Sequence, residues 1–227
     1  MSAGKFLIYG GALAVAMSAG TAGAVVAPKP TVLFQAGTTK VPSWTTATVF
    51  QNFESAKLNT VFDPYYKATS GKLAAGGTWK ETSRTSFVSY AGYVAGEGQS
   101  KTLTALGTYA VSFSLPQQYL SFVIQAPAID SSILNLVLSF ENGTSARYTS
   151  LASLGIGGFA SLLGGRVNFD MGGQSGIKSF SIRGATIDDL ASAAPEPATW
   201  GMMILGFGML GAAMRRQRKV RTAVRFA

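Results

Sequence analysis

The 227-residue sequence contains no cysteine and no histidine, and only 29 of its residues are charged. Without these two residue types the chain has no disulfide framework, no zinc finger, no nucleophile paired with histidine and no imidazole base. Any bound metal must be held by oxygen atoms, which leaves calcium as the common metal to consider. The length predicts one domain with appended segments.

The net charge of +9 is concentrated at the C-terminal end of the chain. Beyond Met214 there are six cationic residues and no acidic one, whereas residues 25–194 hold 12 cationic and 9 acidic residues. A nearly neutral body lacks the electrostatic footprint of a nucleic-acid-binding protein. We therefore expect no nucleic-acid partner.

The N-terminus has the order of a secretory signal peptide: Lys5, an apolar run at residues 6–17, and then small residues. Ala22 and Ala24 form an A-x-A cleavage pattern, so we expect a signal peptide over residues 1–24 and export by the Sec machinery. The alternative is a buried N-terminal helix, which the glycines of this segment disfavour.

The C-terminus combines a short motif, an uncharged stretch and a basic cluster. Pro195, Glu196 and Pro197 precede residues 198–214, which carry no charge. As a helix this stretch is ~25 Å long, near the short limit for a membrane span, with Trp200 at one interface. The positive-inside rule places the following cluster, and the basic extension at 220–227, in the cytoplasm. The cluster consists of Arg215, Arg216, Arg218 and Lys219.

These three ordered parts resemble the C-terminal sorting signal of PEP-CTERM proteins, in the form found in Gram-negative alphaproteobacteria. The same tail is also known as the ice-binding protein C-terminal domain. The resemblance implies that exosortase, a membrane cysteine transpeptidase or protease, acts near Pro195 after export. It further implies a transient membrane anchor, a final place at or outside the cell surface, and a link to exopolysaccharide.

The body at 25–194 shows a periodicity of two, which is typical of half-buried strands. Residues 109–115 alternate clearly until Pro116, which we expect to end that strand, and Asn142-Gly143 predicts a hairpin. Residues 65–79 suggest an irregular connection. We expect a mainly β fold, an antiparallel β-sandwich or jelly roll. Further strands are expected at 119–125, 134–140, 147–149, 167–171 and 180–182.

Asp188 and Asp189 are the acidic pair of greatest interest, although a regular strand would point them to opposite faces. They are candidates for a structural calcium site; alternatively, one caps a turn and the other faces water. The remaining acidic residues form no local motif. We therefore predict no catalytic residue and no required cofactor.

Seven aromatic side chains outside the most regular strands have the apolar face and polar edge suited to sugars, although such rings also plug cores. The sequence thus predicts an exosortase-sorted, non-enzymatic surface or matrix protein associated with exopolysaccharide. The competing interpretations are a polysaccharide-modifying enzyme and a tail-anchored periplasmic protein. The seven aromatic residues are Trp44, Tyr65, Tyr66, Trp79, Tyr90, Tyr93 and Tyr148.

Overall fold

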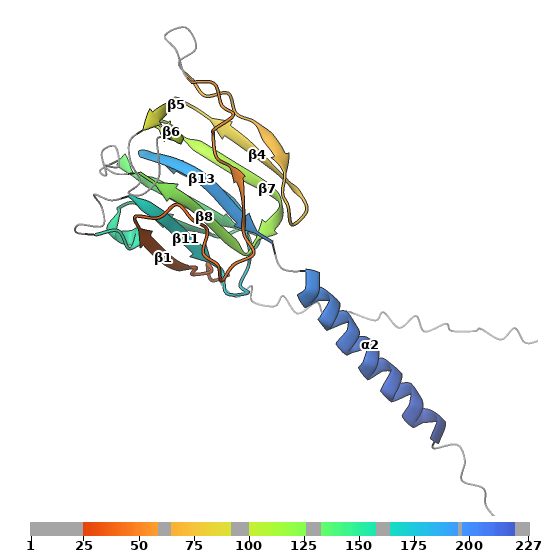
Figure 1. The fold of residues 1–227 in the computed structure, drawn as a ribbon. Coiled ribbons are helices and arrows are strands. Elements are labelled where there is room, and N and C mark those ends of the chain that lie inside the picture. The colour runs from red at the N-terminus through yellow and green to blue at the C-terminus, as the bar shows by residue number, and fades with distance from the viewer. Residues whose placement is uncertain are drawn as a thin grey trace, which may run out of the picture.

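The computed structural model describes residues 25–58, 65–91, 100–125, 133–157, 164–194 and 197–220. Two antiparallel sheets form a sandwich, and a helix, α2 (Pro197–Val220), follows it (Figure 1). The prediction of a mainly β, antiparallel sandwich body is confirmed. The expected signal peptide at 1–24, with Ala22 and Ala24, lies outside the described residues and stays a prediction.

The larger sheet has seven strands in the order β1-β11-β8-β13-β6-β5, with β2 also paired to β13. The last strand of the chain, β13, is central: it pairs with β8 on one side and with β6 and β2 on the other. The strands are β1 (Thr31–Ala36), β2 (Thr48–Gln51), β5 (Ser86–Ala91), β6 (Ser100–Ala105), β8 (Tyr119–Ile124), β11 (Gly165–Asp170) and β13 (Ala185–Ala193).

The smaller sheet has six strands in the order β10-β9-β12-β7-β4-β3. A single 3₁₀ turn, η2 (Ala152–Leu154), follows β10. The strands are β3 (Ser70–Lys72), β4 (Thr78–Ser83), β7 (Tyr109–Gln117), β9 (Asn135–Phe140), β10 (Ser145–Tyr148) and β12 (Ile177–Arg183).

Aromatic side chains fill the space between the two sheets. Phe122 of β8 stacks on Phe180 of β12, with 6.1 Å between ring centroids. Tyr148 of β10 meets Phe169 of β11 at 5.4 Å. Each of these pairs joins one sheet to the other. The alternating apolar residues of the sequence therefore face this shared core, as a two-layer sandwich requires.

The predicted hairpin at Asn142-Gly143 is confirmed. It joins β9 to β10, and Gly143 has a φ of 81°, a conformation that glycine adopts readily. The Asn142 side chain accepts hydrogen bonds from the backbone N–H and the hydroxyl of Thr144. This local bonding fixes the turn.

The expectation that Pro116 ends its strand is wrong, because β7 continues to Gln117. The neighbouring strand β12 shifts register between Ile177 and Ser179, so Pro116 lies beside an irregular part of the ladder. A proline, which lacks an N–H, is tolerated where the regular hydrogen bonding is already interrupted.

The interpretation of residues 65–79 as an irregular connection is wrong in part. β3 and the start of β4 form a short hairpin there, turned by Gly76 and Gly77 with φ of 92° and 82°. β3 is a three-residue edge strand with little burial, so its sequence carries no alternation.

The helix α2 runs from Pro197 through the basic cluster to Val220. Among the described residues, no helix has the length and apolarity needed to cross a membrane. The membrane span expected at 198–214 is thus not found among the described residues and stays a prediction.

Candidate functional site

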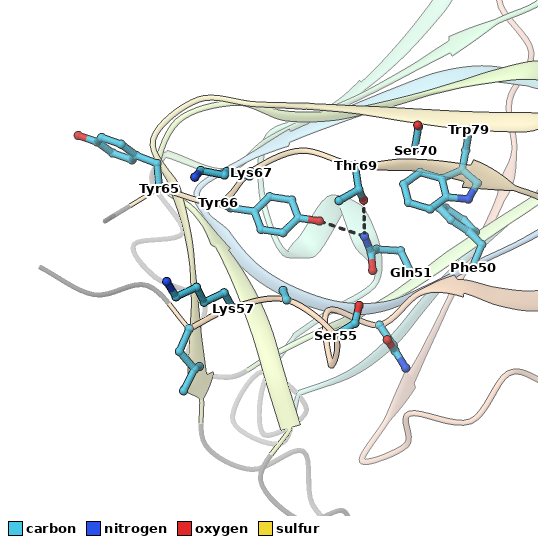
Figure 2. A pocket seen from close by; sticks show the side chains of 13 residues that line it. Phe50, Gln51, Ser55, Lys57, Tyr65, Tyr66, Lys67, Thr69, Ser70 and Trp79 are labelled. Carbon is cyan, nitrogen blue, oxygen red and sulfur yellow. Dashed lines mark hydrogen bonds between the residues drawn. The ribbon is translucent and has the colours of Figure 1, made fainter. Parts of the chain in front are cut away.

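A pocket of about 590 Å³ opens at the edge of the sandwich where β2 approaches β3 and β4. Its size falls within the range of small-molecule sites, roughly 300–1,000 Å³. Tyr65 and Lys57 lie toward one end, and Phe50 and Trp79 toward the other (Figure 2). The lining residues are Phe50, Gln51, Asn52, Ser55, Ala56, Lys57, Leu58, Tyr65, Tyr66, Lys67, Thr69, Ser70 and Trp79.

A buried carboxylate, Glu81 of β4, connects three of these lining residues, with 3% of its surface exposed. Its Oε1 accepts hydrogen bonds from Gln51 Nε2 at 2.9 Å and from the hydroxyl of Tyr109. Its Oε2 accepts from the Tyr66 hydroxyl at 2.8 Å and from the backbone N–H and hydroxyl of Thr69 at 2.9 and 3.0 Å. Five donors therefore converge on one carboxylate.

Both tyrosines of this cluster are held in the protonated form. Burial raises the pKa of Tyr66 and of Tyr109 above the usual tyrosine range, and the negative charge of Glu81 raises it further. Each hydroxyl thus remains a hydrogen-bond donor to Glu81. The two tyrosines therefore act as fixed hydrogen-bond donors at the base of the pocket.

The segment after β2 is shaped by an unusual backbone conformation. Phe53 has a φ of 55°, which is uncommon for a residue other than glycine, and its ring is fully buried. It packs on Tyr66 and Tyr109, with centroid distances of 5.6 and 6.0 Å. Lys101 Nζ donates to the backbone oxygens of Glu54 and Ala56. These contacts hold the pocket wall in place.

The calcium candidates Asp188 and Asp189 lie elsewhere, at an irregularity in β13. The register of β13 against β8 shifts between Asp188 and Ala191, and Asp189 has a φ of 46°. Strict alternation of the two carboxylates to opposite faces is therefore broken by a bulge. Asp188 accepts hydrogen bonds from the Ser100 hydroxyl and from the N–H of Asp189, each at 2.8 Å.

Asp189 is linked to a fully buried cation, Arg166 of β11. The Asp189 backbone oxygen accepts from Arg166 Nη1 at 2.9 Å, and its carboxylate lies 3.8 Å from Arg166 Nη2. The same guanidinium also donates to the Ser121 hydroxyl and to the Thr39 backbone oxygen. Arg166 thereby ties the bulge to β8 and to the loop after β1.

Burial raises the pKa of Asp188 to about 7, with contributions from the negative charges of Asp189 and, less strongly, Glu54. The hydrogen bonds from Ser100 and Asp189 oppose this shift. Within the described ranges, no three acidic side chains gather closely enough to hold a metal ion. Asp188 and Asp189, the candidates for a calcium site, thus have no third acidic side chain beside them among the described residues.

The sorting segment follows β13 directly. Pro195 and Glu196 lie outside the described residues, and α2 begins at Pro197. Of the expected anchor residues, Arg215 is an exposed part of α2. For the other four, the structure describes the helical backbone and not the side chain. These residues are Trp200, Arg216, Arg218 and Lys219.

The structure brings three of the seven expected aromatic platforms together: Tyr65, Tyr66 and Trp79 line the pocket. Trp44 lies apart from them, 55% exposed, with its ring edge-on to Tyr119 at 5.5 Å. Neither Trp44 nor Tyr148 is among the lining residues. Tyr148 packs on the core, Tyr90 lies in β5, and Tyr93 is outside the described residues.

The comparison with known families identifies a PEP-CTERM protein-sorting motif at residues 193–219. The matched segment extends from the last residue of β13 through most of α2. The chain therefore carries a PEP-CTERM sorting signal, and the resemblance noted from Pro195, Glu196 and Pro197 is confirmed. Such a signal implies processing by exosortase and export to the cell envelope or surface.

A solved structure, the family 11 carbohydrate-binding module of the cellulosomal cellulase Lic26A-Cel5E of Clostridium thermocellum, aligns with 66% of this chain and 95% of its own. The identity is 12% and the TM-score 0.22. A TM-score this low establishes no shared function. No curated protein sequence matches the chain.

Sequence reasoning missed Glu81 and Gln51, which organise the pocket floor. Glu81 has no acidic neighbour in sequence, and its partners Gln51, Tyr66 and Tyr109 are distributed over a long stretch of chain. One signal was available: Trp79 and Glu81 share a face of β4, so a glutamate follows a tryptophan into the interior. A buried glutamate on a strand predicts converging donors.

Proposed function

We propose that the chain is an exported protein that exosortase processes near Pro195, leaving the sandwich at the cell surface or in the extracellular matrix. The PEP-CTERM motif at residues 193–219 carries this proposal. In this view residues 1–24 are removed on export through the Sec machinery. The body acts as a non-enzymatic component associated with exopolysaccharide.

The position of β13 supports processing at this point. Nearly all of β13 is buried, and its pairing with neighbouring strands ends at Ala193. Cleavage near Pro195 therefore removes no strand and leaves the sheet complete. A body that keeps all its strands after cleavage is suited to a stable extracellular role.

The surface of α2 supports a transient membrane role for the tail. Ile204, Phe207 and Met214 are among the apolar side chains exposed along it. We propose that residues 198–214 hold the chain at the inner membrane until exosortase acts, with the basic cluster in the cytoplasm. A short apolar segment can be accommodated by local thinning of the bilayer.

A binding role for the body is supported by the hydrogen bonds of its buried glutamate, Glu81. Both oxygens of Glu81 are engaged by five protein donors, so neither is directed at a ligand. Glycoside hydrolysis requires two carboxylates that face one bond. None of the described lining residues is acidic. This supports a site that holds a saccharide without cleaving it.

The test is fractionation of the native host, with mass spectrometry of both termini of the protein, in the presence and absence of exosortase. We expect a mature body that starts near Val25, ends near Pro195 and is found outside the inner membrane. A Glu196→Gln change should reduce this processing, whereas Glu141→Gln, on the exposed hairpin between β9 and β10, should leave it unchanged.

Two results would contradict the proposal. An intact tail at Arg215 to Ala227 in the inner membrane, unchanged by loss of exosortase, would make the protein a tail-anchored periplasmic one. Cleavage of purified polysaccharide by the protein would make the body an enzyme. Both the termini and the activity on polysaccharide are measured on the protein purified from the host.

A further inference from the structure

The pocket joins aromatic and cationic groups along one elongated opening. Phe50 and Trp79 lie at one end, with ring centroids 5.3 Å apart, and Tyr65 stands at the other, 58% exposed (Figure 2). Polar side chains lie between them, among them Gln51 and Ser55. An alternation of flat apolar surface and hydrogen-bonding groups suits a sugar, whose ring faces are apolar and whose edges are polar.

Two of the described lining residues, Lys57 and Lys67, are cationic, and none of the described lining residues is Asp or Glu. The Lys57 ammonium takes part in no hydrogen bond or ion pair within the part of the chain that the structure describes. An exposed lysine at the opening, with no partner among the described residues, favours an anionic ligand.

The floor of the pocket is rigid. Gln51, Tyr66 and Thr69 are each bonded to Glu81, and the Gln51 Oε1 atom also accepts from the backbone N–H of Phe53. A floor whose side chains are already fixed loses little conformational entropy when a ligand binds. Because five donors surround Glu81, both of its oxygens are engaged below the floor and neither is directed at the ligand.

We infer that this pocket binds a saccharide bearing a carboxylate, such as a uronic acid unit of an acidic polysaccharide. Lys57 contacts the carboxylate and Tyr65 stacks on a sugar face. The inference rests on the proposed association with exopolysaccharide and specifies its chemical class. A small inorganic anion fits less well, because it would leave the rings of Phe50 and Trp79, at the opposite end of the pocket from the two lysines, without contact (Figure 2).

The probe is an oligogalacturonate, compared with the same oligomer after its carboxylates have been reduced to alcohols. Both are titrated calorimetrically into the full-length protein in a non-ionic detergent, so that binding is measured independently of processing. We expect the oligogalacturonate to bind and the reduced oligomer to bind at least about fivefold more weakly, the loss of roughly one ion pair. Added salt should weaken binding of the acidic oligomer alone.

Two variants with matched controls locate the site. Lys57→Gln should weaken oligogalacturonate binding about fivefold, while Lys40→Gln, an exposed lysine outside the pocket, should have no effect. Tyr65→Ala should weaken binding of both oligomers about fivefold to tenfold, while Trp44→Ala, a similarly exposed aromatic, should not. All four side chains are exposed, so the variants are expected to fold.

The inference is overturned if the oligogalacturonate does not bind, if the reduced oligomer binds equally well, or if inorganic sulfate alone displaces the acidic oligomer at equal concentration. It is also overturned if Lys40→Gln and Trp44→Ala weaken binding as much as their pocket counterparts. Processing of the same variants in the host separates this result from the proposed function. Normal sorting of Lys57→Gln with no binding by any form would reject the ligand and keep the sorting proposal.

Discussion

The two sheets of the sandwich each bury a carboxylate, and they do so in opposite ways. Glu81, in the smaller sheet, is surrounded by five hydrogen-bond donors from strands and loops distant in sequence. Asp188, in the larger sheet, has two donors, and the charges of Asp189 and Glu54 act against its ionised form. The first carboxylate has both oxygens engaged by donors, whereas burial and neighbouring charges disfavour the ionised form of the second.

The two carboxylates therefore have different consequences for the protein. A carboxylate surrounded by donors acts as a fixed acceptor that orients Gln51, Tyr66 and Thr69 at the pocket. A carboxylate with few donors, buried at 5% exposure, takes up a proton close to neutral pH. The Glu81 cluster fixes the shape of the pocket floor, whereas Asp188 makes the free energy of unfolding depend on pH.

The largest effect is expected from Glu81→Gln. The amide nitrogen of the new side chain would face donors where a carboxylate oxygen now accepts, so at least two buried donors would lose their acceptor. We expect the free energy of unfolding to fall by about 2–4 kcal/mol. Urea denaturation followed by tryptophan fluorescence measures this change, since Trp79 is buried beside the cluster.

Glu141→Gln is the matched control, because Glu141 is an exposed residue of the β9–β10 hairpin and its backbone N–H donates to the Gly176 backbone oxygen. Its free energy of unfolding should stay within about 0.5 kcal/mol of the unchanged protein. Equal losses in the two variants would show that Glu81 is not the organising group of the pocket floor.

The second-largest effect is a gain in the free energy of unfolding. Asp188→Asn should stabilise the protein at pH 8 by about 2 kcal/mol, because a neutral side chain avoids burial of a charge next to Asp189 and Glu54. Denaturation curves at pH 8 measure the change. A loss of stability at pH 8 would mean that the ionised carboxylate is favourably held and would reverse the contrast with Glu81.

The same residue sets a pH dependence. Its pKa rises from 3.8 to about 7 on folding, so between these values the folded state binds more protons than the unfolded state. The contribution of Asp188 is fully present below about pH 4 and is lost as the pH rises through 7. The loss is at most about 4 kcal/mol. Asp188→Asn should remove this part of the pH dependence of the unfolding free energy.

A smaller effect is expected from Tyr66→Phe. Glu81 would lose one of five donors and keep the others, so the free energy of unfolding should fall by about 1 kcal/mol. Binding of the oligogalacturonate should weaken in parallel, because Tyr66 also lines the pocket. Unchanged stability and binding would indicate that the remaining donors fix the floor alone.

The smallest effect is expected from Ser100→Ala, which removes one of the two donors to Asp188. The hydroxyl lowers the pKa of Asp188, so its loss should move that pKa further up. Titration of the Asp188 carboxyl carbon by NMR measures the shift. A downward shift would show that the hydroxyl does not stabilise the ionised form.

Sequence alone predicted the strands that have one apolar and one polar face. Residues 109–115 and 134–140 alternate because only one face of β7 and of β9 meets the core. The hairpin at Asn142-Gly143 was predictable because its turn chemistry is local. The sorting signal was predictable because its order along the chain is itself the signal.

The strands that were not predicted contain interruptions of that pattern. In β4 the next inward-facing position after Trp79 is occupied by Glu81. A glutamate in the sequence suggests an exposed position, although this one is buried. In β13 the bulge at Asp188 and Asp189 shifts the phase of the alternation. The pocket itself depends on hydrogen bonds between residues as distant as Gln51 and Glu81, and no local pattern encodes such contacts.

The central place of β13 also determines when the body can fold. Its neighbours β2, β6 and β8 cannot complete their hydrogen bonding until the final strand arrives, because β13 lies between them. Such long-range strand pairing is slow and requires the whole body to be present. The larger sheet therefore cannot close until Ala193 is in place. The sorting motif begins at the same residue, so the fold is completed at the point of the chain where the sorting signal starts.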